Sequence, residues 1–70
     1  MPTPEEIERL FTYHPPTEES IEKLKKVREA AKNLATVISE KAPESADKSA
    51  AIRLLRESVM TANAAIVLNQ

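Results

Sequence analysis

The sequence contains no cysteine and no glycine, and its single histidine is His14. Without cysteine there is no disulfide framework, no thiolate zinc site and no cysteine nucleophile. One histidine with no neighbouring carboxylate cluster also lacks the ligand spacing of a metal site. The missing glycine disfavours β-hairpin turns and excludes the glycine-rich loops that bind phosphate in many enzymes.

Catalytic groups are equally scarce. Ser20, Ser45 and Ser58 have no histidine at the spacing of a nucleophile and its base. The glutamates fall on the surfaces or in the first turns of predicted helices. We therefore expect no catalytic residues, no metal and no cofactor, and we do not expect an enzyme.

An excess of charge of one sign is also missing, because ten Lys and Arg oppose eleven Asp and Glu. Duplex nucleic acid is not an expected partner, since binding it requires many phosphate contacts, but a small anion remains compatible with this balance. No apolar run approaches the roughly 20 residues of a membrane span, and the first residues do not resemble a signal peptide. These features predict a cytosolic protein with no membrane partner.

The sequence has five prolines, and they mark the boundaries between helices in the absence of glycine. Pro15-Pro16 and Pro43 separate three segments that favour helix. The residues placed to cap these segments are Thr3, Thr17 and Ser45. The predicted helices span about residues 4–10, 18–41 and 46–68. The fold class is therefore all-α, a short N-terminal helix followed by a long antiparallel helical hairpin, in a single domain over residues 1–70.

Apolar residues recur at three- and four-residue steps in both long segments, as expected for helices that pack on each other. The first stripe comprises Ile21, Leu24, Val27, Ala31, Leu34, Ala35 and Ile38, and the second comprises Ala51, Ile52, Leu55, Val59, Ala62 and Ile66. Met60, Ala64 and Val67 add apolar surface on the opposite side of the last helix. Because a short chain without disulfides or metal usually needs partner chains, these features predict a homo-oligomer.

Both aromatic residues and the histidine gather in one short stretch that contains Phe11, Tyr13 and His14. On the helix that follows, Lys25, Arg28 and Lys32 form one cationic edge beside the apolar stripe. An aromatic ring next to guanidinium and ammonium groups suits a nucleobase attached to phosphate. These six residues are the candidate ligand-binding residues.

Other interpretations of the same residues stay open. Cations beside an apolar stripe are often solvated, with their stems covering hydrophobic surface. Phe11 and Tyr13 are also suited to pack a short helix against a hairpin, and His14 to cap or to face solvent. A helical protein-interaction module without a nucleotide ligand is the alternative function, and a single-strand nucleic-acid module is disfavoured by the charge balance.

The stretches "FTYHPP", "VREAAKNLATVI" and "AIRLLRESVMTANAAI" occur in this order between residues 11 and 66. This ordered set resembles the phage anti-CBASS sponge family, whose helical-hairpin domain is shared with an anti-Thoeris sponge. The sequence departs from the pattern at Thr61, where an aromatic residue is common, and at Ala42, where cysteine is common.

The resemblance implies a homo-oligomer, a hexamer, that binds cyclic di- or trinucleotides without cleaving them. Such a protein removes a second messenger of bacterial anti-phage immunity in the cytoplasm of the infected host. By matching position, Tyr13 is expected to contact the nucleotide, and Arg28, with Lys25 or Lys32 as substitutes, is expected to pair with phosphate. The preferred cyclic nucleotide is not specified.

Overall fold

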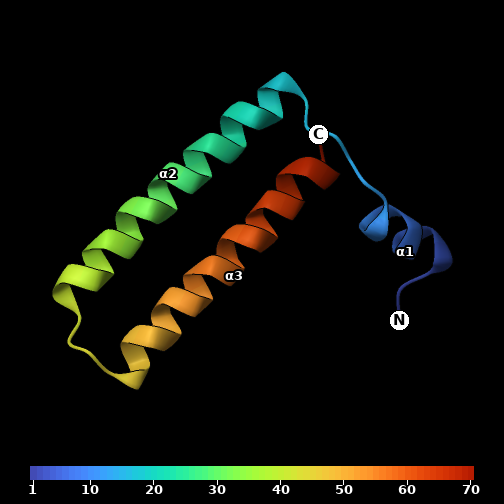
Figure 1. Ribbon diagram of the computed structural model, residues 1–70. Helices are drawn as coiled ribbons and strands as arrows, with labels where there is room; N and C mark the ends of the chain where they lie inside the picture. The colour runs from blue at the N-terminus through green and yellow to red at the C-terminus, as the bar shows by residue number, and fades with distance from the viewer.

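The computed structural model describes residues 1–70 and contains three α-helices and no strand. They are α1 (Pro4–Phe11), α2 (Glu18–Lys41) and α3 (Ala46–Leu68). Helices α2 and α3 lie side by side and antiparallel, and α1 stands off the open end of this hairpin, near the C-terminus (Figure 1). The predicted all-α helical hairpin is confirmed.

Each helix begins at a hydroxyl side chain that serves as its N-cap. The Oγ atoms of Thr3, Thr17 and Ser45 each accept a hydrogen bond, at 3.1 Å, from the backbone N–H three residues later. These bonds satisfy helical N–H groups that have no partner inside the helix. Acidic residues occupy the first turn of all three helices, where the helix dipole favours negative charge. The three predicted caps are therefore confirmed.

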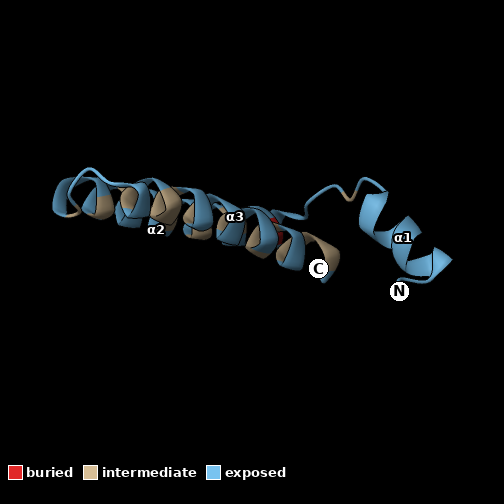
Figure 2. Ribbon diagram, turned by 90° about the horizontal axis from the view of Figure 1, so that it is seen from below, coloured by how far each residue is buried: buried red, intermediate tan, exposed pale blue.

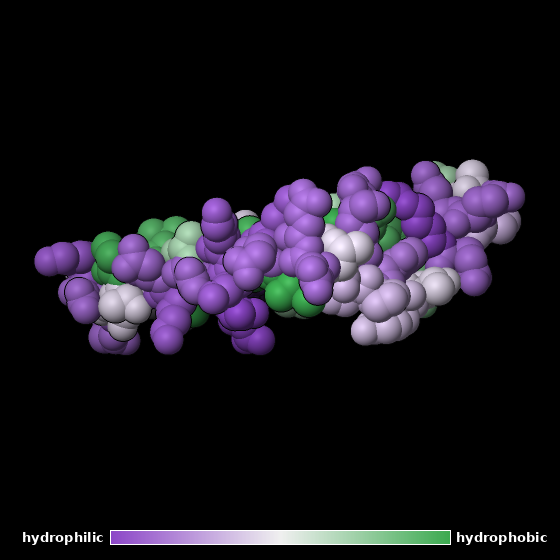
Figure 3. Space-filling view, turned by 90° about the horizontal axis from the view of Figure 1, so that it is seen from above, coloured by the Kyte–Doolittle hydropathy of each residue, from purple (hydrophilic) through white to green (hydrophobic).

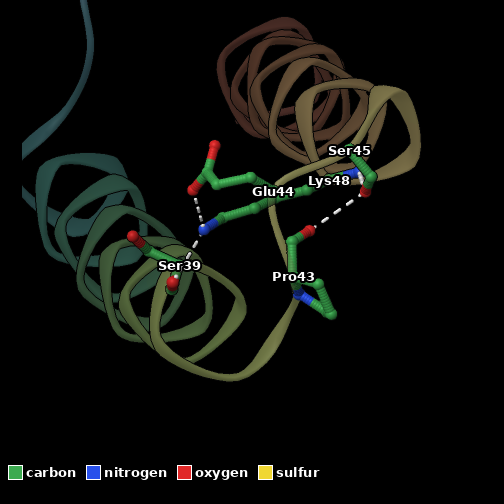
Figure 4. A network of polar contacts seen from close by, with 5 residues as sticks. All are labelled: Ser39, Pro43, Glu44, Ser45 and Lys48. Carbon is green, nitrogen blue, oxygen red and sulfur yellow. Dashed lines mark hydrogen bonds and ion pairs between the residues drawn. The ribbon is translucent and has the colours of Figure 1, made fainter.

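The turn between α2 and α3 closes around Lys48 without any glycine (Figure 4). Its ammonium group donates to the carbonyl oxygen of Ser39 at 2.9 Å and to the carboxylate of Glu44 at 2.6 Å. The Lys48 side chain is only 14% exposed. The hydrogen bond from Lys48, together with its positive charge, lowers the pKa of Glu44. Lys48 therefore satisfies an end carbonyl of α2 and ties it to the start of α3.

The hairpin forms a single layer of helices with no closed core. The principal extents of the chain are 45 × 32 × 12 Å, so the molecule is much thinner in one direction than in the other two. Ser20 is the only buried residue, and no apolar residue is buried. Figure 2 shows this thin layer edge-on, with exposed and half-buried residues along its length. Both broad faces of the hairpin are therefore open.

The apolar stripes face each other only along a narrow line. Leu24, Ala31, Leu55 and Val59 are half-buried between the helices. Ile21 and Leu34 belong to the predicted stripe, yet they remain 49% and 48% exposed. Figure 3 shows a long, narrow side of the molecule on which apolar side chains lie among polar ones. None of the three helices combines the length and apolar composition that a membrane span requires.

We expect Lys48→Met to lower the free energy of unfolding by about 1–2 kcal/mol, because the end carbonyl of α2 loses a charged hydrogen-bond donor. Thermal unfolding followed by circular dichroism measures the change. Lys26→Met is the matched control, since Lys26 is exposed within α2 and makes no ion pair. Equal melting temperatures for the two variants would show that Lys48 does not lock the turn.

Candidate functional site

A groove with a volume of about 450 Å³ lies between α2 and α3 on one broad face of the hairpin. It is formed where small side chains of α2 oppose larger ones of α3. We refer to it as the cationic groove. Its lining residues are Arg28, Ala31, Lys32, Ala35, Ile52, Leu55, Arg56, Val59 and Met60.

The groove has an apolar floor because both helices place their contact stripes there. Ala31 and Ala35 lie one turn apart on α2, and their short side chains leave the space open. Ile52, Leu55 and Val59 supply the floor from α3. A flat apolar group can therefore lie between the helices without leaving buried polar atoms unpaired.

Three cations and no carboxylate line this floor: Arg28 and Lys32 from α2, and Arg56 from α3. The two ion pairs of the chain, Lys23–Glu19 and Lys48–Glu44, lie outside the groove. On their own helices, Arg28 and Arg56 have no acidic residue three or four positions away, where a neutralising partner would stand, whereas Lys32 has Glu29 three positions before it. The groove thus concentrates positive charge in a chain whose net charge is −1.

The structure brings together some of the predicted ligand-binding residues and leaves others apart. Arg28 and Lys32 line the cationic groove, whereas Lys25 is an exposed residue of α2 outside its lining. Phe11 ends α1 and is 83% exposed, and Tyr13 follows it in the linker to α2 and is 81% exposed. Neither aromatic ring lines the groove. One chain by itself therefore does not combine the aromatic and cationic groups.

His14 connects the linker to α1 through one hydrogen bond. Its Nε2 lies 2.6 Å from the carbonyl oxygen of Arg9, and since a carbonyl only accepts, this nitrogen carries the donated proton. The Arg9 guanidinium donates in turn to the carbonyl oxygen of Leu68 and to Oδ1 of Asn69, each at 3.2 Å. These bonds connect α1 and the linker to the end of α3.

Gln70 anchors the linker a second time. Its Nε2 donates to the carbonyl oxygen of Pro15 at 2.8 Å, and its Oε1 accepts from the backbone N–H of Thr17 at 3.0 Å. The side chain therefore bridges the two sides of Pro16. Together with the Arg9 contacts, it determines where the exposed Tyr13 ring stands relative to the hairpin.

Sequence reasoning missed Arg56, the cation that α3 adds to the groove. Arg56 lies four residues after Ile52 and four before Met60, and all three line the groove. The prediction that Met60 lies on the side of this helix opposite the stripe is therefore wrong, because Met60 borders the groove beside Ile52, Leu55 and Val59. The four-residue spacing identifies Arg56 as a site residue only when it is known which side of α3 faces the cationic edge of α2. That pairing follows from the packing of two helices rather than from either helix alone.

The opposite broad face of the hairpin differs in its chemistry. A smaller hollow of about 280 Å³ lies there, and we call the residues that line it the uncharged face. Its lining residues are Val27, Ala30, Ala31, Leu34, Leu55, Ser58, Val59 and Ala62. None of them is charged, so this face suits contact with another apolar protein surface rather than with an anion.

No group of three His, Asp or Glu side chains is arranged to hold a metal ion.

A short leading helix, a glycine-free helical hairpin and a cationic groove define a small helical-hairpin domain. The Acb2/Tad1, hairpin domain family matches residues 3–67. The chain therefore belongs to this family of anti-CBASS and anti-Thoeris sponges, which is known for sponge-type binding of cyclic nucleotides. The predicted family is thus confirmed. The chain matches no curated protein and no solved structure.

We expect Gln70→Ala to speed hydrogen exchange at the Thr17 amide by about fivefold, because that N–H loses a hydrogen bond of about 1 kcal/mol. Amide exchange measured by NMR reports this position directly. Asn69→Ala is the matched control, since Asn69 contacts Arg9 rather than Thr17 and its removal should leave the amide nearly unchanged. Identical exchange in the two variants would contradict the anchoring role of Gln70.

Proposed function

We propose that this protein binds cyclic di- or trinucleotide second messengers of bacterial anti-phage immunity and sequesters them without cleavage. It acts in the cytoplasm of the infected host and needs no cofactor. The observation that carries the proposal is the pair Arg28 and Lys32, which belong to the lining of an apolar groove that contains no carboxylate. Membership of the sponge family supports the same chemistry.

The groove has groups that suit both the phosphates and the bases of a cyclic nucleotide. Each phosphodiester group carries one negative charge and oxygen acceptors, which the guanidinium of Arg28 binds through two parallel hydrogen bonds. Lys32 adds a second donor one turn along α2. The bases present flat faces that pack on an apolar floor or stack on an aromatic ring.

Tyr13 supplies that ring in our proposal, with Phe11 and His14 shaping its surroundings. Because Tyr13 is exposed and lies outside the groove of its own chain, the ring and the cations are best combined across two copies. A phenol ring stacks on a base while its hydroxyl forms a hydrogen bond. Lys25 lies on the same helix as Arg28 and is the further candidate for a phosphate contact.

The assembly we propose is a homo-oligomer, with a hexamer as the expected size from family resemblance. A chain that buries no apolar residue has little hydrophobic stabilisation of its own. Leu34, Leu54 and Met60 are 48%, 57% and 64% exposed, so apolar surface is present on both helices. Contact through the uncharged face would cover Leu34 without bringing the cations of two copies together.

We expect the purified protein to sediment at several times its 7.8 kDa mass. Leu34→Glu should shift it toward the monomer, because an unpaired carboxylate in a packed interface costs several kcal/mol to desolvate. Sedimentation velocity measures both. Asn33→Glu is the matched control, since it adds the same charge one position away, outside the hollow of the uncharged face. A wild-type monomer that stays helical at micromolar concentration would contradict the assembly.

We expect calorimetric titration of cyclic di- and trinucleotides to show binding that Arg28→Ala weakens by about 1.5–3 kcal/mol, through lost hydrogen bonds to phosphate. Tyr13→Ala should cost about 1–3 kcal/mol through lost stacking. Titrations of Lys25→Ala and Lys32→Ala test which of these two lysines makes a further phosphate contact. Each variant is checked for helicity and sedimentation, so that a loss of binding is not a loss of assembly.

Sequestration without cleavage requires that bound nucleotide be recovered intact after heat releases it. Protein-dependent linear product on chromatography would contradict the proposal. If wild type binds none of the nucleotides, the alternative is a helical protein-interaction module, which the apolar lining of the uncharged face favours. Wild-type binding that none of the four substitutions weakens would place the site elsewhere.

A further inference from the structure

The cationic groove is bounded by charge from both helices. Arg28 and Lys32 extend from α2, and Arg56 extends from α3 on the other side of the apolar floor. Packed helices lie about 8–10 Å apart, so long side chains on both can reach one ligand. Arg56 also has no carboxylate at i±3 or i±4, and it takes part in neither ion pair of the chain.

We propose that Arg56 is a second phosphate-binding residue, which makes the groove selective for a ligand with two phosphodiester groups held across α2 and α3. This inference rests on the proposed function and deepens it. Arg28 and Lys32 hold one phosphate at the α2 side, and Arg56 holds the other at the α3 side. The base and sugar portions span the apolar floor between them.

Charge complementarity favours a ligand with two phosphodiester groups, rather than a second copy of the chain, as the occupant of the cationic groove. Two copies packed groove to groove about a two-fold axis would bring both sets of cations together, and like charges at an interface oppose association. The uncharged face presents no such obstacle. An anionic ligand instead neutralises the cations that the chain leaves unpaired.

The experiment compares Arg56→Gln with Arg53→Gln in titrations with cyclic di-AMP. Arg53 is the matched control, because it carries the same charge one turn earlier on α3, lies outside the groove lining and has Glu57 four positions later. Arg56→Gln should weaken binding about 10- to 100-fold, the loss expected for charged hydrogen bonds to phosphate, and Arg53→Gln by less than about twofold. Arg56→Lys, which keeps the charge but loses the paired donors, should lie between them.

Cyclic AMP, which has one phosphate, separates a ligand contact from a structural role. In NMR titrations its affinity should be nearly the same for wild type and Arg56→Gln, since α2 alone holds a single phosphate. If both ligands weaken equally, Arg56 acts on the fold and the inference is overturned. If Arg28→Ala weakens cyclic di-AMP binding but Arg56→Gln matches Arg53→Gln, the inference is overturned while the proposed function stands. If wild type binds neither ligand, the inference is overturned, and the titrations with the other cyclic di- and trinucleotides decide the proposed function.

Discussion

The packing of α2 on α3 along a single line is the contact on which the rest of the molecule depends. Two helices can bury only the stripes that face each other, and small residues such as Ala31, Ala35 and Ala62 allow these stripes to approach closely. No third layer covers either broad face, so no apolar residue becomes buried. The groove and the uncharged face both follow from this geometry, because each is an open side of the same helix pair.

The distribution of charge explains how a nearly neutral chain can present a cationic groove. Many carboxylates are used at helix starts, where the dipole stabilises them, including Glu5, Glu6, Glu18, Glu19 and Asp47. The groove lies along the middle of the hairpin, away from these turns, and its lining contains no carboxylate. Net charge therefore gives a poor measure of the local charge of the groove, since acidic and basic residues occupy different parts of the helices.

Local features of the fold could be predicted from sequence because they depend on neighbours within one turn. Thr17 and Ser45 cap helices through bonds three residues long, and Pro43 marks the turn. The relation between Tyr13 and the groove could not be predicted in this way. The linker is positioned by Arg9 and Gln70, whose partners lie 53 to 60 residues away in the chain.

The residues of the candidate site likewise divide into those that one helix alone predicts and those that depend on how two helices pack. The periodicity of α2 was enough to place Arg28 and Lys32 on one side of the helix, but Arg56 joined them only once the rotation of α3 about its axis was known. The exposure of Leu34 has a related cause, because a seven-residue stripe is wider than the line that one neighbouring helix can cover. Sequence periodicity identifies apolar surface without specifying which partner covers it.

The two ends of the hairpin are fixed by different kinds of interaction. Lys48 closes the turn from within the matched residues 3–67, whereas the linker is anchored by Leu68, Asn69 and Gln70, which lie beyond them. A change in these last residues can therefore move the aromatic entry segment while the hairpin and its groove keep their geometry. The position of Tyr13 therefore depends on residues that make no contribution to the groove itself.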